Sequence, residues 1–498
     1  MNHASRSPSH TVVIIGAGMA GLTTAAYLAR AGLKVQVYEQ HTLPGGYISS
    51  FVREGFTFPA GPSSITSNGI VFPILKELGL ADKRKFLHVG HQMSWGDQDV
   101  ALRNPRQVRE ALSKRFPAQS RALERYFRWV EIGGGGFRQL VESGMMFGQG
   151  ILPKVLGLLV KHPLMPWASW VARGQTNRSL HARYFADPAL RQMLDELAYP
   201  VMPAQNTLGM WISYFDDTWV PAGGMQAFAN TLVRFMREHG GELRLGKAVR
   251  RIRVEHGRAL GVELEDGDFV PADWVISAAD LRHTCFELIG RGHLPPSMIA
   301  KLEAARPSEP VFAVFLGLRG SPELERAFER FHEAHVIFTC ADGKTIQVAW
   351  LSRDDPSVAP PGKQALFVGR LDNFADWEPH KGDEAAYRAR KAAVVDELIT
   401  RAEEFLPGLR AHIEVQDAAS PLTYERYTSN WQGATTGWNW NPALAPHFNF
   451  AKDLPLKNFF AVGHYTFNPG GVPTAMITAW YIAREIIKKV QPARMEGK

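Results

Sequence analysis

The chain has 498 residues, more than one hydrophobic core usually organises, so we expect two or three interleaved domains. It contains only two cysteines, Cys285 and Cys340, and neither has a neighbour at metal-ligand or redox spacing, so the composition supports neither a disulfide framework nor a metal centre. The net charge of +7 is dispersed, without a compact basic run or a recognition motif, and we therefore expect no nucleic-acid partner.

The N-terminus and the hydropathy pattern bear on location. The first ten residues are polar and lack the apolar core of a signal peptide, so we interpret them as a short disordered lead-in. No uninterrupted apolar segment reaches the roughly 20 residues that a membrane-spanning helix needs. Together with the low cysteine content, these features favour a reducing cytoplasm and leave peripheral attachment to a membrane open.

Residues 11–39 carry a complete βαβ pattern. An apolar run at residues 12–15 predicts a buried parallel strand, a helix with an apolar face follows, and a second strand ends at Glu39. Three glycines stand between strand and helix at GxGxxG spacing, namely Gly16, Gly18 and Gly21. The first permits a tight turn, the second lets backbone approach a pyrophosphate, and the third lets the helix pack closely on the strand.

The same unit predicts which dinucleotide binds. The N-terminus of the helix offers unpaired N–H groups and a positive dipole end to phosphates. Glu39 can accept hydrogen bonds from the ribose hydroxyls, whereas a 2′-phosphate at that position would be repelled. The sequence therefore predicts a dinucleotide site that disfavours NADP.

A second glycine-rich segment follows the βαβ unit. Gly45 and Gly46 break the chain, and the alternation of residues 51–58 predicts a short hairpin before Gly61 and Pro62. The double glycine followed by GFTFPAGPS resembles the second signature of the flavin-dependent amine oxidase and phytoene desaturase superfamily. The resemblance implies that this loop lies along FAD, which makes FAD the expected cofactor. The cofactor contacts that it implies in the first two motifs are Gly16, Gly18, Ala20, Gly21, Glu39, Gln40, Gly45, Gly46, Tyr47, Gly61, Pro62 and Ser63.

The sequence departs from that signature at one place. Amine oxidases usually carry an arginine after the double glycine, whereas Tyr47 stands here. We therefore expect a charged contact to the phosphate to be replaced or absent.

Helical periodicity dominates from residue 71 to about residue 137. A glycine cluster at residues 133–136 follows a helix-like segment and has no acidic partner at the proper distance, so we expect a flexible hinge there.

Residues 143–186 contain no Asp or Glu. Apolar stretches in this segment are punctuated by basic residues and two tryptophans, namely Lys154, Lys161, Arg173, Arg178, Arg183, Trp167 and Trp170. Short helices of this composition are typical of an element that lies on a membrane surface. The alternative is a buried helical cap over the substrate cavity, and both interpretations can hold.

The block at residues 221–281 predicts a return to the nucleotide domain. It consists of a helix at residues 226–238, two hairpin-like strands, and a parallel strand at residues 274–277. In the superfamily, the strand after such a helix supplies a backbone contact to the adenine, and by position this contact falls on Val249.

Residues 282–406 alternate short strands with helices and predict a substrate domain with an antiparallel sheet. The closing segment runs from a strand that ends at Val462 to a C-terminal helix, and its GGVP motif resembles that of the desaturases. The resemblance places the N-terminus of this helix against the flavin, where the dipole stabilises negative charge. The flavin contacts that it implies are Gly463, Gly470, Gly471 and Val472.

The resemblance covers most of the chain and favours the phytoene desaturase and carotenoid isomerase branch. It implies an α/β fold with a Rossmann-type FAD-binding domain, an interleaved mixed-sheet substrate domain and a helical, membrane-associating subdomain. We expect the FAD-binding domain at residues 11–70, 221–281 and 441–490, the helical region at residues 71–220, and the substrate domain at residues 282–440.

The implied activity is FAD-dependent desaturation of an isoprenoid or carotenoid-like substrate by hydride transfer to the flavin. Three alternatives stay open: a reduced-flavin isomerase or saturase, an amine oxidase, and a flavin-bearing lipid-binding protein without activity. An amine oxidase needs an aromatic pair near the flavin, for which Trp438 and Trp440 are candidates. Among the candidate acids and bases His162, His181, His283 and His464, we favour His464, because it adjoins the flavin motif. The sequence departs from the superfamily here, which commonly has Asp or Glu at the position of His464.

Overall fold

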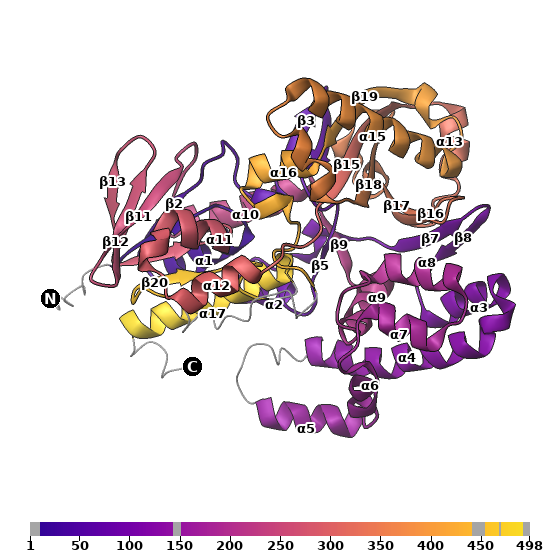
Figure 1. Ribbon diagram of the computed structural model, residues 1–498, viewed down its shortest axis with the longest axis horizontal. Coiled ribbons are helices and arrows are strands. Elements are labelled where there is room, and N and C mark those ends of the chain that lie inside the picture. Colours follow the sequence, from indigo (N-terminus) through magenta and orange to yellow (C-terminus); the bar gives the residue numbers. More distant parts are fainter. Residues whose placement is uncertain (1–9, 143–150, 441–453, 468–469, 492–498) are drawn as a thin grey trace.

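The computed structural model describes residues 10–142, 151–440, 454–467 and 470–491. Figure 1 shows a part that contains both ends of the described chain, a second part built on a large sheet, and a helical subdomain beside that sheet. We call the first the nucleotide-binding part, because it contains the predicted dinucleotide-binding unit at residues 11–39. The chain passes between the first two parts several times, so each of these two is assembled from segments far apart in the sequence, whereas the helices of the helical subdomain all lie within residues 105–216.

A parallel five-stranded sheet forms the centre of the nucleotide-binding part. Its strands, in spatial order, are β10 (Glu242–Arg244), β2 (Lys34–Tyr38), β1 (Thr11–Ile15), β14 (Trp274–Ser277) and β20 (Phe459–Ala461). The predicted strands at residues 12–15 and 274–277 are therefore confirmed, and they pair directly with each other.

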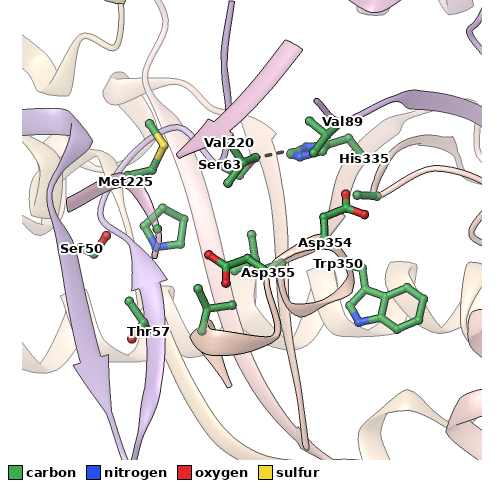
Figure 2. A pocket seen from close by; sticks show the side chains of 15 residues that line it. Ser50, Thr57, Ser63, Val89, Val220, Met225, His335, Trp350, Asp354 and Asp355 are labelled. Carbon is green, nitrogen blue, oxygen red and sulfur yellow. Dashed lines mark hydrogen bonds between the residues drawn. The ribbon is translucent and has the colours of Figure 1, made fainter. Parts of the chain in front are cut away.

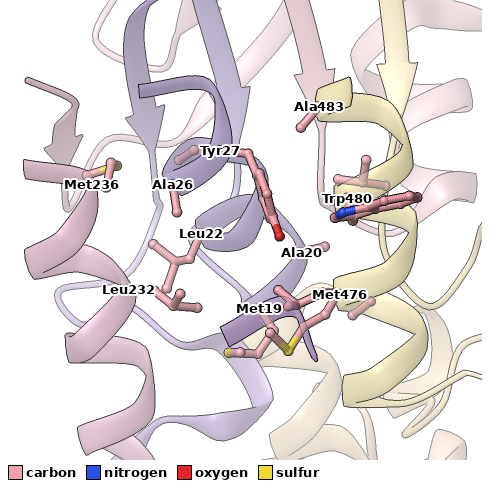
Figure 3. Close-up of a cluster of buried hydrophobic side chains, with 14 of the residues drawn as sticks. Met19, Ala20, Leu22, Ala26, Tyr27, Leu232, Met236, Met476, Trp480 and Ala483 are labelled. Carbon is pink, nitrogen blue, oxygen red and sulfur yellow. The ribbon is translucent and has the colours of Figure 1, made fainter. Parts of the chain in front are cut away.

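Three helices cover one face of this sheet: α1 (Met19–Arg30), α10 (Met225–Glu238) and α17 (Val472–Val490). Figure 3 shows Leu22 of α1 beside Leu232 of α10, and Met19 beside Met476 of α17, within one buried cluster. The short helix α2 (Val71–Leu78) packs against α17. Because these contacts join the two ends of the chain, the N-terminal and C-terminal segments are held as one unit.

The opposite face carries a small antiparallel sheet of β11 (Val249–Glu255), β12 (Arg258–Leu264) and β13 (Phe269–Pro271). Alternate residues of β1 serve the two faces: Val12 and Ile14 belong to the helix-side core, whereas Val13 and Ile15 belong to the other core. Residues 12–15 are all apolar because both faces of this strand are buried. The helices α11 (Leu281–His283) and α12 (Pro296–Ala304) follow this sheet in the chain.

The second part is built on a seven-stranded mixed sheet. Its order is β19 (Ile413–Ala419), β15 (Val311–Arg319), β18 (Lys363–Leu371), β17 (Thr345–Trp350), β16 (His335–Thr339), β7 (His91–Trp95) and β8 (Gln98–Ala101). All neighbours are antiparallel except β16 and β7. The helices that belong to this part are α13 (Pro322–Phe328), α14 (Leu351–Asp354), α15 (Glu384–Phe405) and α16 (Pro421–Thr428).

The helical expectation for residues 71 to about 137 is wrong over its middle. Besides β7 and β8, this stretch contains β6 (Phe86–His88), which joins β9 (Thr218–Pro221) and β5 (Ile65–Thr66) in a small sheet. β6 and β7 lie against partners far away in the sequence, and β8 forms a hairpin with β7. Such pairing overrides a local helical pattern. The hairpin expected at residues 51–58 is confirmed as β3 (Ser50–Arg53) and β4 (Phe56–Pro59).

The helical subdomain comprises α3 (Pro105–Arg115), α4 (Ser120–Glu142), α5 (Ile151–Lys161), α6 (Met165–Ala172), α7 (Asn177–Tyr184), α8 (Pro188–Ala198) and α9 (Asn206–Asp216). Among the described residues, none of the helices combines the length and the apolarity needed to cross a membrane.

The glycine cluster at residues 133–136 lies inside α4, so the expected hinge is wrong. A Cβ added to Gly133 would lie 2.5 Å from Cδ1 of Leu208 and 3.2 Å from Cβ of Ala168. A Cβ on Gly136 would lie 2.8 Å from the sulfur of Met165. The glycines therefore allow neighbouring helices, among them α6 and α9, to pack closely against α4.

Candidate cofactor site

The glycines of the first motif take up the geometry that a phosphate loop needs. Gly16 has φ +94°, and its N–H donates to the carbonyl of Tyr38 at 2.8 Å. A Cβ on Gly21 would lie 2.0 Å from the carbonyl oxygen of Gly16, so only glycine permits this packing of α1 on β1. A Cβ on Gly18 would meet nothing within 4 Å, and no side chain caps the N-terminus of α1 there. The first turn of α1 therefore faces open space with its N–H groups available.

The double glycine lies directly against this loop. The N–H of Gly45 donates to the carbonyl of Ala17 at 2.8 Å, and Gly18 and Gly45 form a parallel bridge. Both Gly45 and Gly46 have positive φ, and a Cβ on Gly46 would lie 3.4 Å from Cα of Gly18. We call these two loops, residues 16–21 and 45–46, the glycine cradle. Its backbone walls fit a pyrophosphate, which side chains would obstruct.

Glu39 is held beside the cradle at the carboxyl end of β2. Its side chain is buried, and it accepts hydrogen bonds from the N–H of Ala17 at 2.7 Å and from the N–H of His41 at 2.9 Å. These two bonds orient the carboxylate that is expected to bind the ribose. Gln40 is exposed and donates to Oγ of Ser429 at 3.1 Å.

Val249 is the first residue of β11, and the chain just before it contacts Glu39 at the end of β2. The N–H of Lys247 donates to the carbonyl of Glu39 at 2.9 Å, so the chain leading into β11 runs past the end of β2. Val249 lies two residues further on, and its contact with the adenine stays a prediction.

The C-terminal motif meets the first motif at the same edge of the parallel sheet. A Cβ on Gly463 would lie 3.7 Å from Cβ of Ala20, and the N–H of Gly463 donates to Oγ1 of Thr478 at 2.9 Å. Gly471, with φ +137°, precedes α17, which begins at Val472 and has no side-chain cap. The ends of the chain thus present two uncapped helix N-termini beside the glycine cradle.

Tyr47, which replaces the usual arginine, is occupied by structural contacts. Its hydroxyl lies within hydrogen-bond distance of the carbonyl oxygens of Gly433, at 2.9 Å, and Ala434, at 3.0 Å. Its ring stacks on Tyr424 at 5.5 Å, and burial raises the pKa of Tyr47, which keeps the phenol neutral. A Cβ on Gly61 would lie 2.3 Å from the carbonyl oxygen of Tyr47, so the hairpin folds back onto this residue, while Pro62 is exposed.

His464 lies between two glycines of the last motifs. A Cβ on Gly470 would lie 2.8 Å from Cβ of His464, and one on Gly437 would lie 2.7 Å from the His464 carbonyl oxygen. The side chain keeps some solvent access, but the surrounding atoms desolvate the imidazole, and this burial lowers the pKa of His464 to about 4. The imidazole is therefore neutral at physiological pH.

Two of the other histidine candidates are held in the scaffold through their imidazoles, and the third is held through its backbone. His181 is buried between Asp195 and Tyr126, and His162 lies 2.8 Å from Oε1 of Gln139. His283 belongs to α11, where its N–H donates to Asp280 at 2.8 Å.

Trp438 and Trp440 do not face each other as a cage. Trp438 is buried in the core and donates its indole N–H to the carbonyl of Tyr465 at 2.7 Å. Trp440 stacks instead on Tyr199 of the helical subdomain, with ring centroids 4.7 Å apart.

A pocket beside Ser63, lined by apolar side chains and a few polar ones, was missed by sequence reasoning. Its empty volume is about 470 Å³, including space open to solvent, and it lies between β3, β4, α10 and α14. Figure 2 shows Ser63 and His335 on one side of this pocket and Asp354 and Asp355 on another. Of these four residues, only Ser63 belongs to a recognisable motif, and no local pattern marks the rest.

Comparison with known proteins supports the assignment of the site. The family model described as flavin containing amine oxidoreductase matches residues 19–487. A 4,4'-diapophytoene desaturase (4,4'-diapolycopene-forming) and a 4,4'-diapolycopene oxygenase, both from Methylomonas sp, are each 26% identical over 96% of this chain, covering 95% and 98% of the relatives. A chloroplastic prolycopene isomerase from Daucus carota is 24% identical, over 86% of this chain and 72% of the isomerase.

The fold is likewise found among solved structures. An oxidoreductase from Methanosarcina mazei has a TM-score of 0.65 at 16% identity, covering 95% of this chain and 100% of that one. The expected α/β fold class and the resemblance to phytoene desaturases and carotenoid isomerases are confirmed. The glycine cradle fits the cofactor of that family, and the cofactor is FAD.

Proposed function

We propose that this chain, which belongs to the family of flavin-containing amine oxidoreductases, desaturates a carotenoid-like hydrocarbon with FAD as the electron acceptor. The observation that carries the proposal is the glycine cradle, completed by Gly463 from the far end of a chain that is similar over 96% of its length to a 4,4'-diapophytoene desaturase. Bound FAD supplies a two-electron acceptor for a hydrogen on the substrate. The work left to the protein is to bind the cofactor, hold the carbon chain and exclude competing reactions.

We infer four roles for the site residues toward FAD. Backbone N–H groups of the cradle bind the pyrophosphate, and Glu39 binds the adenosine ribose. The N-terminus of α17, with Gly470, Gly471 and Val472, stabilises negative charge on the flavin through the helix dipole. His464 is neutral and lies beside this end of the helix, where it contacts the edge of the flavin without adding a positive charge.

We also propose that helices α5 and α6 attach the protein to the cytoplasmic surface of a membrane. Six of the 13 large hydrophobic side chains that are exposed in the described residues lie within residues 156–170: Leu156, Leu159, Val160, Leu164, Trp167 and Trp170. Figure 1 shows α5 at the outer edge of the helical subdomain, away from both large sheets. We call this surface the α5–α6 apolar patch.

The opposite side of α5 and α6 packs on the rest of the helical subdomain. Leu158, Ala168 and Val171 are buried, and Ala168 and Val171 belong to the core of the helical subdomain. One face of α5 and α6 therefore packs on the protein while the other offers apolar surface, with Lys161 and Arg173 exposed at its margin. This arrangement suits an interfacial element that delivers a lipid-soluble substrate.

The test of the function is incubation of the FAD-loaded protein with separate liposome-borne substrates, followed by mass analysis. The panel contains phytoene, 4,4'-diapophytoene, prolycopene and a set of primary amines. Loss of pairs of hydrogens together with bleaching of the flavin supports desaturation. An unchanged mass with altered retention indicates isomerisation, a gain of oxygen indicates oxygenation, and peroxide release with amines indicates an amine oxidase. Each of these three outcomes contradicts the proposal.

A further inference from the structure

Three segments from separate parts of the chain meet at the pocket of Figure 2. Ser63 comes from the loop that is expected to lie along FAD, His335 is the first residue of β16, and Asp354 is the last residue of α14. Oγ of Ser63 lies 3.5 Å from Nδ1 of His335. The flavin loop is thereby connected to a pocket that opens to solvent.

The imidazole of His335 is buried and has few polar neighbours. Its exposed fraction is 9%, and it faces Ser63 on one side and the ring of His91, from β7, at 5.3 Å on the other. The His91 ring packs in turn on Tyr214 of α9 at 4.9 Å. Burial lowers the pKa of His335 to about 4, and both burial and the neighbouring histidines lower the pKa of His91 well below its usual value. At physiological pH, His335 is thus a neutral imidazole able to take up a proton and release it again.

The two carboxylates of the pocket, Asp354 and Asp355, differ in burial and in hydrogen bonding. Asp355 is buried, and its oxygens accept from the N–H groups of Gly223 at 2.7 Å and Ser357 at 3.2 Å. Asp354 lies at the surface, and its Oδ1 is 4.0 Å from Nε of Arg353, with which it forms an ion pair. Partial burial of its carboxyl raises the pKa of Asp354, which suits a group that exchanges protons between the pocket and water.

Desaturation requires such a path. When two adjacent carbons form a double bond, one hydrogen leaves with both electrons of its C–H bond as a hydride to FAD. The other C–H bond also breaks, its electrons form the new π bond, and its hydrogen leaves as a proton. Because a hydrocarbon substrate offers no group to accept that proton, the protein has to remove it.

We propose that Ser63 and His335 form a proton relay, which carries this proton from the flavin loop to the pocket, where Asp354 passes it to solvent. The inference rests on the proposed desaturation. His335 acts through Ser63 and is a positioning and relay residue in this scheme. The second imidazole, His91, has a buried Nδ1 without a hydrogen-bond partner among the described residues, and its lowered pKa makes it a neutral neighbour of His335.

The relay is tested by anaerobic single turnover of the full FAD-loaded chain with 4,4'-diapophytoene in liposomes. Flavin bleaching reports hydride transfer, and a pH-indicator dye in weak buffer reports the released proton. The variants are His335→Gln, which keeps a polar side chain but cannot carry the proton, and Ser63→Ala. The matched control is His239→Gln, because His239 hydrogen-bonds a carbonyl of its own helix end, that of Phe235, at 2.8 Å.

We expect His335→Gln and Ser63→Ala to slow bleaching and proton release together by about 10²-fold per bound FAD, with the FAD content of His335→Gln unchanged and His239→Gln at the wild-type rate. Added imidazole should raise the rate of a His335→Ala protein at least tenfold above its rate without imidazole. A merely structural role of His335 would not allow this rescue. Wild-type rates in both relay variants overturn the relay alone, as does a slow His335→Ala protein that imidazole does not accelerate. A wild-type protein that neither bleaches nor changes the mass of any hydrocarbon overturns the proposed function, and the relay with it.

Discussion

Gly470 lies against Thr436 so closely that a Cβ on this glycine would be 1.8 Å from the Thr436 carbonyl oxygen. The contact joins the segment before the last flavin motif to the turn that leads into α17. It therefore sets where the N-terminus of α17 ends up relative to the glycine cradle. A side chain at Gly470 would have to displace backbone, since the obstructing atom belongs to the main chain.

Gly470→Ala should accordingly release FAD. We expect at least a tenfold rise in the Kd for FAD, because the shifted turn misplaces the helix end that faces the flavin. The ratio of flavin to protein absorbance after gel filtration measures the loss. Gly157→Ala, in exposed α5 where a Cβ meets nothing within 4 Å, is the control and should keep its flavin. Full FAD retention by Gly470→Ala would show that this turn is not part of the site.

Glu39→Gln should weaken FAD binding without unfolding the protein. The carboxylate accepts two backbone N–H groups, and an amide would turn its own NH₂ toward one of them. Loss of hydrogen bonds to a charged acceptor costs about 1.5 to 3 kcal/mol, or roughly 10-fold to 100-fold in Kd. Fluorescence of free FAD during dilution measures the change. Glu255→Gln, at the exposed end of β11, should bind FAD as the wild type does, and equal affinities of the two variants would contradict the role of Glu39.

Tyr126→Phe should destabilise the helical subdomain. The Trp211 indole N–H donates to the Tyr126 hydroxyl at 3.1 Å, and that hydroxyl lies 3.1 Å from Nε2 of His181, whose Nδ1 bonds Asp195 at 2.6 Å. Removal of the hydroxyl leaves a buried donor and a buried acceptor unpaired, at a cost of about 1 to 3 kcal/mol. Hydrogen exchange of amides in α4, α7 and α9 should become faster. Tyr427→Phe, with an exposed ring, is the control, and unchanged exchange in Tyr126→Phe would refute the network's contribution.

Stability should fall as the pH drops below 6.5 toward about 4, in part because of His335 and His464. Burial lowers the pKa of each to about 4 in the folded protein, against 6.5 for an ordinary histidine. Between these values the unfolded chain binds protons that the folded chain does not, so acid favours unfolding. Each histidine contributes a slope of up to about 1.4 kcal/mol per pH unit. Urea unfolding across this range should show a smaller slope for His335→Gln and His464→Gln, and slopes equal to that of the wild type would contradict the buried neutral imidazoles.

Substitution within the α5–α6 apolar patch should release the protein from membranes. Val160→Ser combined with Trp170→Ser removes the two most exposed large side chains of the patch, at 81% and 67% exposure. If each inserts, the loss is about 1 to 2 kcal/mol per side chain, or roughly tenfold in partition for each. Flotation with anionic liposomes measures binding. Phe269→Ser, on the distant sheet of β11 to β13, serves as the control, and undiminished flotation of the double variant would exclude the patch as the attachment surface.

Local patterns were sufficient for much of the nucleotide-binding part. The βαβ unit, the hairpin at residues 51–58, α10 and the strand β14 were all predicted, because glycine spacing and apolar periodicity act over a few residues. The role of Gly21 was also predictable, and the observed packing of α1 on β1 leaves no room for a Cβ at this residue.

Contacts between distant segments were decided only by the tertiary structure. The sequence by itself determined that a dinucleotide-binding loop, a double glycine and a closing GGVP motif were present, and the resemblance indicated FAD. It could not show that β7 joins β16, that the glycines of α4 serve packing, or that Ser63, His335 and Asp354 share one pocket. These features depend on side chains brought together across hundreds of residues, where the free energy comes from burial and strand pairing that no short window of sequence contains.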